Sequence, residues 1–139
     1  MSDAISDRLG LLDAARTGDA GTVCRLLAAG TDPNAKDPLS GYTALQYAAT
    51  AGHLGIVRML VEAGAQVADR RNTVFQSALA GAVVAGRAEV VAYLLDHGAD
   101  PRERLYGDDA SLVEEAERAG FQDVAVLLRR ALNGDATAE

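Results

Sequence analysis

Glycines recur along this chain at a fixed interval of 34 residues. One series comprises Gly18, Gly52, Gly86 and Gly120, and a second comprises Gly30, Gly64 and Gly98. A constant interval of this length is typical of a solenoid, in which one structural unit is repeated and stacked. The interval therefore limits the fold more than any other feature does. The question of function becomes which surface of the stack is left exposed.

Residues 43–64 show the repeated unit most clearly. Thr43 can cap a first short helix with its hydroxyl, and Gly52 can adopt the left-handed conformation that ends it. A second short helix is predicted over 54–62, and Gly64 ends it. Apolar residues lie on one face of each helix, at spacings of three and four: Leu45, Ala48 and Ala49, then Ile56, Val57, Leu60 and Val61.

The same pattern returns one interval away in both directions. The equivalent apolar residues are Leu11, Ala14, Ala15, Val23, Leu26 and Leu27 on one side, and Leu79, Val90, Val91, Leu94, Leu95, Leu112, Val113, Val124, Leu127 and Leu128 on the other. Each helix is too short to be stable alone in water, so its apolar face must be buried against the adjacent unit. The sequence thus predicts a stack of helical pairs.

Several segments of the unit carry a family resemblance. They read TALQYAA at 43–49, GHLGIV at 52–57, EAGA at 62–65, DHGAD at 96–100 and DPNAKD at 32–37. Over residues 6–132 the chain resembles ankyrin repeats, although Ala44 stands where the family usually has proline and Gln46 where it usually has histidine. The resemblance implies an all-α ankyrin-repeat solenoid of stacked helix-turn-helix units joined by β-hairpin-like loops.

Four such units fit into the chain as one domain. We expect a single ankyrin-repeat domain over residues 1–133, with repeats near 6–36, 37–69, 70–103 and 104–133, and a flexible tail over 134–139. The interval is one residue longer than the ~33 typical of the family. We expect the extra residue in the hairpin loops, for instance within 37–41.

Both ends of the predicted stack carry polar residues where the middle units are apolar. These residues are Thr22, Arg25, Glu117 and Arg129. Terminal repeats of a solenoid need a polar outer face, because no further unit covers them. We therefore expect a complete array of four capped repeats.

Composition narrows the class of protein further. The chain has 139 residues, of which 49% are hydrophobic and 24% charged, as expected of one folded domain. Its net charge of −7 disfavours nucleic acid as a partner. The single cysteine, Cys24, excludes an internal disulfide and a cysteine metal cluster. We expect a cytoplasmic protein with no membrane partner, because no signal peptide or spanning segment is evident. We expect a bacterial source, because alanine, glycine and arginine are frequent and Lys36 is the one lysine among 13 basic residues, as in GC-rich coding.

Candidate catalytic or ligating residues are few. His53 and His97 stand at different points of the repeat and are expected to serve turn packing and a helix end. Cys24 is expected to be a surface or half-buried thiol. The acidic residues near 108–117 either favour a helix N-terminus or form a site for a cation or a basic partner. We therefore predict no catalytic residue, no metal and no cofactor.

A glycine inside a predicted helix leaves one alternative to consider. Gly81 is equivalent to Tyr47 and Glu115, and its missing side chain either relieves crowding against Tyr47 or leaves a notch for a small ligand. We favour crowding. An enzyme or ligand-binding protein that uses this notch is the weaker hypothesis, because no catalytic constellation accompanies it.

The resemblance implies a binding surface made of hairpin tips and the exposed side of each first helix. The predicted tip residues are Leu39, Ser40, Tyr42, Thr73, Val74, Gln76, Tyr106 and Asp108, and the predicted helix residues are Thr50, Val84 and Arg118. A basic row is formed by Arg70, Arg71 and Arg104, with Arg102 and Lys36. The apolar tips either bind a partner or pack locally, and the basic row either meets an acidic partner or is ordinary solvated charge.

The function predicted from these residues is a monomeric, non-catalytic protein–protein interaction module. Two alternatives stay open. The chain could be a small inhibitor or immunity-type protein of a single target, or a structural subunit that self-associates through its apolar tips. The sequence does not identify the partner, because a fold does not by itself specify a function.

Overall fold

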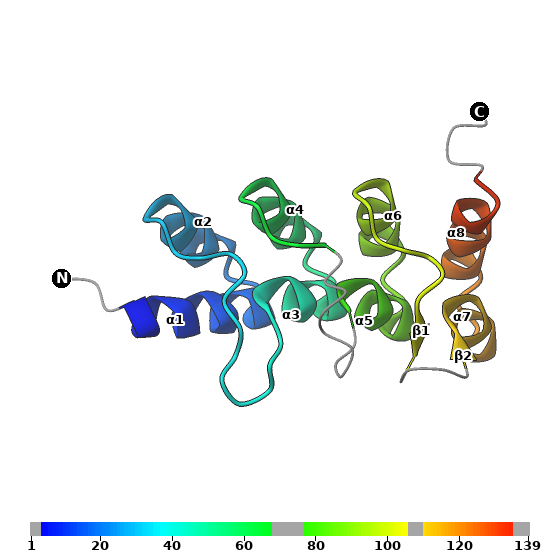
Figure 1. Ribbon diagram of the computed structural model, residues 1–139, viewed down its shortest axis with the longest axis horizontal. Coiled ribbons are helices and arrows are strands. Elements are labelled where there is room, and N and C mark those ends of the chain that lie inside the picture. The colour runs from blue at the N-terminus through cyan, green and yellow to red at the C-terminus, as the bar shows by residue number, and fades with distance from the viewer. Residues whose placement is uncertain (1–3, 68–76, 106–109, 135–139) are drawn as a thin grey trace.

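In the computed structural model, helices pair and stack side by side along one axis (Figure 1). The structure describes residues 4–67, 77–105 and 110–134, and these ranges contain eight α-helices and two short strands. The elements are α1 (Ala4–Thr17), α2 (Ala20–Ala28), α3 (Ala44–Ala51), α4 (Leu54–Glu62), α5 (Ala78–Ala85), α6 (Ala88–Asp96), β1 (Arg104–Leu105), β2 (Ala110–Ser111), α7 (Leu112–Ala119) and α8 (Gln122–Leu132).

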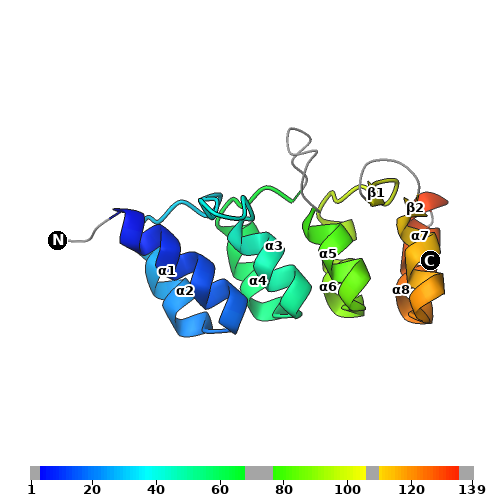
Figure 2. The same cartoon turned by 90° about the horizontal axis from the view of Figure 1, so that it is seen from below.

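The helices form two layers. The first helices of the pairs, α1, α3, α5 and α7, make one layer, and α2, α4, α6 and α8 make the other (Figures 1 and 2). The loop before α3 extends away from the second layer. The predicted stack of helical pairs is confirmed, and so are the helices expected at 44–51 and 54–62.

Side chains next to the helices fix where the first helices begin. Thr43 Oγ1 accepts the Gln46 N–H, while Gln46 Oε1 accepts the Thr43 N–H at 2.7 Å, so two otherwise unpaired donors are satisfied. Ser111 and Glu114 form the same reciprocal pair at α7. Gln46, which departs from the family pattern, is therefore used locally as a capping residue.

The predicted apolar faces form one core that runs through all the pairs. Its largest fully buried side chains are Leu11, Leu45, Leu60, Leu79, Leu94, Leu112, Leu128, Val23, Val57, Val83, Val90 and Val91. Each first helix packs against the first helix of the next pair, so no pair buries its core alone. This mutual burial stabilises helices that are only eight or nine residues long in the middle units.

The first glycine series lies in the turn between the two helices of a pair. Gly18, Gly52 and Gly86 have φ of +94°, +84° and +74°, a conformation that costs a residue with a side chain about 1–2 kcal/mol. A side chain of the next pair lies over each glycine. A Cβ built on these glycines would lie 2.9 Å from His53 Cε1, 2.8 Å from Arg87 Cδ and 2.7 Å from Phe121 Cζ, respectively.

The second series differs. Gly30, Gly64 and Gly98 also have positive φ, but no side chain lies within 4 Å of a built Cβ, and the same holds for Gly120. The expectation that His53 packs on a turn is confirmed. Gly18, Gly52 and Gly86 thus serve both backbone conformation and packing between pairs, whereas Gly120 and the second series serve conformation alone.

Two loops before first helices share one hairpin register. An antiparallel bridge joins Lys36 and Thr43, and β1 pairs with β2 through Arg104 and Ser111 and through Leu105 and Ala110. Lys36 and Arg104 are equivalent positions, and so are Thr43 and Ser111. The expected β-hairpin-like connections are therefore present at both places.

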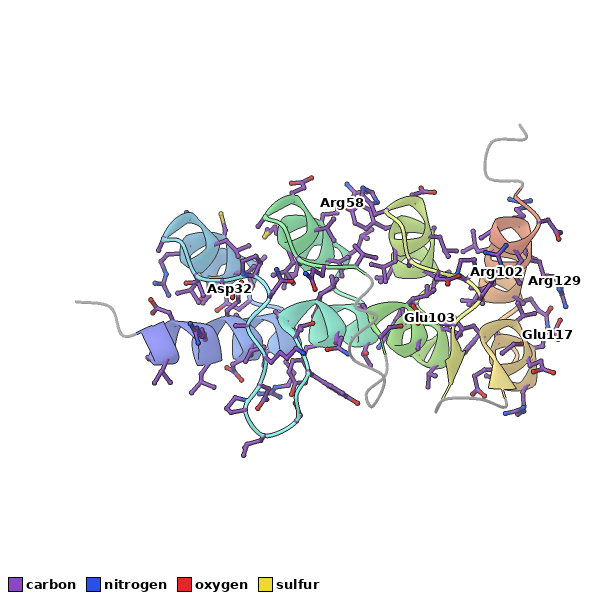
Figure 3. All side chains as sticks on the ribbon, viewed as in Figure 1. Asp32, Arg58, Arg102, Glu103, Glu117 and Arg129 are labelled. Carbon is purple, nitrogen blue, oxygen red and sulfur yellow. The ribbon has the colours of Figure 1, made fainter. Side chains whose placement is uncertain are left out.

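Three of the four predicted end residues are exposed, and Thr22 is half-buried. Thr22 Oγ1 donates to Asp19, the capping residue of α2. At the other end Glu117 of α7 and Arg129 of α8 form an ion pair (Figure 3). Helix α1 is longer than the other first helices, an extension that the sequence analysis did not predict.

Candidate protein-binding surface

The first hairpin, residues 37–42, is held in one conformation by Asp37. The Leu39 N–H donates to Asp37 Oδ1 at 2.8 Å, and the Gly41 N–H donates to the Asp37 carbonyl at 2.7 Å. The Asp37 N–H in turn donates to the Tyr42 carbonyl at 2.8 Å. Gly41 has φ of +80°, which a glycine adopts without strain. The loop is therefore closed by its own backbone and one carboxylate.

Tyr47 on α3 fixes this hairpin to the helix layer. Its hydroxyl donates to Asp37 Oδ2 at 2.8 Å and lies 2.8 Å from Ser40 Oγ, which then donates to it. The Tyr42 ring packs edge-on against the Tyr47 ring, with centroids 5.6 Å apart. Of the two possibilities for Tyr42, local packing is thus present, and the side chain stays half-buried.

These hydrogen bonds also shift two pKa values. The Leu39 N–H and then the Tyr47 hydroxyl hold the pKa of Asp37 below its ordinary 3.8, so this carboxyl is ionised at neutral pH. Burial raises the pKa of Tyr47 above its ordinary 10.0, so the phenol keeps its proton. Donor and acceptor are therefore in the states that the hydrogen bond requires.

Leu39 lies at the tip of this hairpin and is 96% exposed. Burial of a leucine side chain is worth about 1.5–3 kcal/mol, so a partner that covers Leu39 would gain energy that the chain alone does not use. The predicted tip residue is therefore available to a partner, while Ser40 beside it is used to hold the loop.

The exposed side of the first helices forms a second part of the surface, which we call the first-helix face. We define it by Asp13, Arg16, Tyr47, Thr50, Val84, Glu115 and Arg118. At one end Arg16 Nη2 lies 2.5 Å from Asp13 Oδ1, and at the other Arg118 Nη1 lies 3.0 Å from Glu115 Oε1. Between these ion pairs, Thr50 is exposed and Val84 is 40% exposed. The predicted residues Thr50, Val84 and Arg118 are thus all on one accessible face.

Gly81 corrects one expectation. A Cβ on this buried glycine would lie 2.3 Å from Thr50 Oγ1, so the side chain that needs the space is Thr50 and not Tyr47. The Thr50 hydroxyl also occupies the place where a ligand notch was considered. The prediction of crowding is right in kind but wrong in its partner, and the notch is absent.

Several predicted site residues lie outside the part of the chain that the structure describes. They are Arg70, Arg71, Thr73, Val74, Gln76, Tyr106 and Asp108. For Arg104 only the backbone is described, in β1. Lys36 and Arg102 are both exposed and lie in the loops of different units, and Arg102 is equivalent to Asn34, two positions before Lys36. The basic row stays a prediction.

Glu103 is a titratable group at the third hairpin that the sequence analysis did not single out. It stands at the position of the buried Ala35 and accepts a hydrogen bond from Ser77, which caps α5 (Figure 3). Burial raises the pKa of Glu103 above its ordinary 4.5, the Ser77 hydrogen bond lowers it, and the nearby Asp100 raises it. A charge at this position is therefore disfavoured.

The remaining candidate residues have local roles. His97 at the end of α6 stacks on the Tyr93 ring at 4.0 Å, and its Nδ1 lies 2.8 Å from the Tyr93 carbonyl. Cys24 is exposed, as expected. Within the described ranges no three His, Cys, Asp or Glu side chains are grouped to hold a metal ion. Among the helices of those same ranges, none is long and apolar enough to cross a bilayer.

The paired short helices, the hairpins before first helices and the accessible first-helix face define a helical solenoid of repeated units. A family model for ankyrin repeats in three copies matches residues 11–104, more than half of the chain. This chain belongs to the ankyrin repeat family. A search of curated proteins found no match. Ankyrin repeats are generally protein–protein interaction modules and are typically not enzymes.

Some surface residues were missed by sequence reasoning. Arg118 was predicted, but Asp13 and the pairing of both arginines with carboxylates were not. Asp13 and Glu115 are equivalent positions, as are Arg16 and Arg118, so the repeat interval could have shown the matched ion pairs. The role of Tyr47 in holding the hairpin had no such signal, because it depends on a loop that folds back to the helix.

Proposed function

We propose that this chain is a non-catalytic module that binds another protein through the first hairpin and the first-helix face. The observation that supports it is Leu39, which is 96% exposed on a loop held by Asp37 and Tyr47. Preorganised apolar side chains lose little conformational entropy when a partner covers them. A partner with an apolar pocket for Leu39 would gain most of the energy of that burial.

The proposal includes where and how the module acts. We propose a cytoplasmic monomer from a bacterium that binds neither nucleic acid nor membranes. The exposed thiol of Cys24 supports a reducing compartment, and the net charge of −7 supports a protein partner over nucleic acid. Light scattering at high concentration should give the mass of one chain; a larger mass would favour self-association instead.

Affinity capture with matched variants tests the binding surface. The wild type, Leu39→Ala and Val126→Ala serve as baits in an extract of the native cell. Val126 is 42% exposed on α8 in the other layer, so it controls for loss of any exposed apolar side chain. We expect the partner captured by the wild type to bind Leu39→Ala at least about tenfold more weakly, a loss of about 1.4 kcal/mol.

The result that contradicts the proposal is equal capture by Leu39→Ala and the wild type. Loss of capture with Val126→Ala but not with Leu39→Ala would move the binding surface to the second layer of helices. Each bait is first checked by urea unfolding, so that a fold defect is not read as a binding defect.

A further inference from the structure

The charged residues of the first-helix face form two rows along the stack. The row nearer the hairpins comprises Asp13, Tyr47, Gly81 and Glu115, and the row nearer the turns comprises Arg16, Thr50, Val84 and Arg118. Acidic groups therefore stand at both ends of the first row and arginines at both ends of the second. The residues between these ends are uncharged, and Tyr47 among them donates to the ionised Asp37 of the first hairpin.

The end charges can still engage a partner although they are paired with each other. An arginine has five N–H donors and a carboxylate about four acceptor positions, and the pairs use only part of these. In the centre, Thr50 and Val84 are exposed, and Gly81 contributes no side chain. A complementary segment therefore has apolar side chains in its middle. At each of its two ends it carries a basic group on the side that faces the acidic row and an acidic group on the side that faces the arginines.

The spacing of the helices favours one secondary structure for that segment. Packed helices lie about 8–10 Å apart, and an α-helix returns a side chain to the same face every seven residues, or about 10.5 Å. An extended strand returns one every ~6.7 Å and falls out of register with the helices below it. The three distances between neighbouring first helices, from α1 to α7, add up to about 30 Å. This is the length of a helix of about 20 residues.

We propose that the first-helix face binds an amphipathic α-helix of the partner protein, laid along the stack across α1, α3, α5 and α7. This inference rests on the proposed function and adds the kind of segment that is bound. The bound helix has an apolar centre, basic side chains toward Asp13 and Glu115, and acidic side chains toward Arg16 and Arg118. The uncharged centre lets its apolar side chains cover Thr50 and Val84.

Two synthetic helical peptides of identical composition test the charge pattern. Both have about 20 residues and leucines at seven-residue spacing in the middle. One carries the complementary flanks, and the other has its basic and acidic flanks exchanged. Binding of each to the full chain is measured by fluorescence anisotropy. We expect the complementary peptide to bind at least about tenfold more tightly.

A variant of the chain with its own charges exchanged provides the matched control. It combines Asp13→Arg, Arg16→Asp, Glu115→Arg and Arg118→Glu, which keeps an ion pair at each end and so preserves the local helix contacts. We expect this variant to prefer the second peptide by a similar factor. Val126→Asp, in the other helix layer, should leave both affinities unchanged.

Three results would overturn the inference. One is an equal affinity of the two peptides, another is a preference that does not invert with the exchanged variant, and the third is a dissociation constant weaker than about 1 mM for both. A proline-rich peptide of equal length that binds the same face more tightly would also replace the helix as occupant. None of these results changes the capture experiment with Leu39→Ala, so failure of the helix inference and failure of the proposed function remain distinguishable.

Discussion

The solenoid has two edges, one formed by the turns within the helical pairs and the other by the hairpins before the first helices. Different kinds of contact stabilise them. At the turn edge, where the first helix of each pair connects to the second, Gly18, Gly52 and Gly86 repeat one backbone conformation and each is covered by a side chain of the next pair. At the hairpin edge the units differ, because among the hairpin residues that the structure describes the contact of Asp37 with a first-helix tyrosine is made in the first hairpin alone. Glycine and glutamate stand at the position of Tyr47 in the later units.

The difference separates what holds the stack together from what distinguishes its surface. Repetition at the turn edge keeps the pairs in register, so a change at any glycine that is covered by the next pair is expected to affect stability in the same way. Individual contacts at the hairpin edge orient particular side chains, so changes there are expected to affect one loop.

Substitution of Gly86 by alanine should have the largest effect. The left-handed backbone costs about 1–2 kcal/mol and the contact with Phe121 about 1–3 kcal/mol more, so we expect a loss of about 3 kcal/mol in the free energy of unfolding. Gly120→Ala is the matched control, because φ is similar but no atom lies within 4 Å of its Cβ. Its expected loss is about 1–2 kcal/mol. Urea unfolding measures both, and equal losses would show that the covering side chain contributes nothing.

Removal of one hydroxyl should loosen the hairpin edge alone. Tyr47→Phe deletes the hydrogen bonds to Asp37 and Ser40, and we expect a loss of about 1 kcal/mol together with faster hydrogen exchange of the Leu39 and Ser40 amides. The pKa of Asp37 should rise toward its ordinary 3.8, as measured by NMR titration. Unchanged exchange at these amides would mean that the loop holds its shape without α3.

A double-mutant cycle tests the contact that crosses from one pair to the next. Gly81→Ala gains about 1 kcal/mol of helix propensity, but its Cβ must displace Thr50 Oγ1, so the single variant should gain less than that. With Thr50→Ala present, the full gain of about 1 kcal/mol should appear. Thermal and urea unfolding of the four proteins give the coupling. Additive effects would indicate that Thr50 rotates away at no cost.

The smallest effect is expected at Glu103 and depends on pH. Since burial raises its pKa, the folded state binds the proton more tightly than the unfolded state, and stability falls as pH rises from about 4.5 through the folded value. Glu103→Gln should therefore raise Tm by about 2 °C near pH 7 and have no such effect near pH 4. The same gain in Tm at both pH values would contradict the assignment to ionisation.

Much of the fold could be predicted because it depends on local, repeated signals. Thr43, Gly52 and the apolar spacing located α3 and α4 to within a residue. The covering contacts of the turn edge could not be predicted, because His53, Arg87 and Phe121 share a position but no chemistry. A sequence comparison treats them as unrelated, and only the structure shows that all three lie over a glycine.

The positions of the exposed surface residues could be predicted from the sequence, but the contacts between side chains could not. The family resemblance located Leu39, Thr50 and Val84 on accessible positions, and all three are exposed. The partner of Gly81 was assigned to Tyr47 because the two are equivalent within the repeat, yet the space is taken by Thr50, which faces it from the preceding helix. Equivalence relates positions in different units, whereas contact depends on the stacking between them.

The side chains that lie over the turn glycines bear on how the number of repeats in such a gene can change. A second copy of residues 53–86 inserted after Gly86 would again place every covering side chain 35 residues beyond a glycine, since each junction repeats the same separation. Unequal crossing-over at these positions would thus lengthen or shorten the array by whole units and keep that separation, with a histidine then covering Gly52 and Arg87 covering Gly86. Length is then free to vary by recombination, while the hairpins diverge by point substitution.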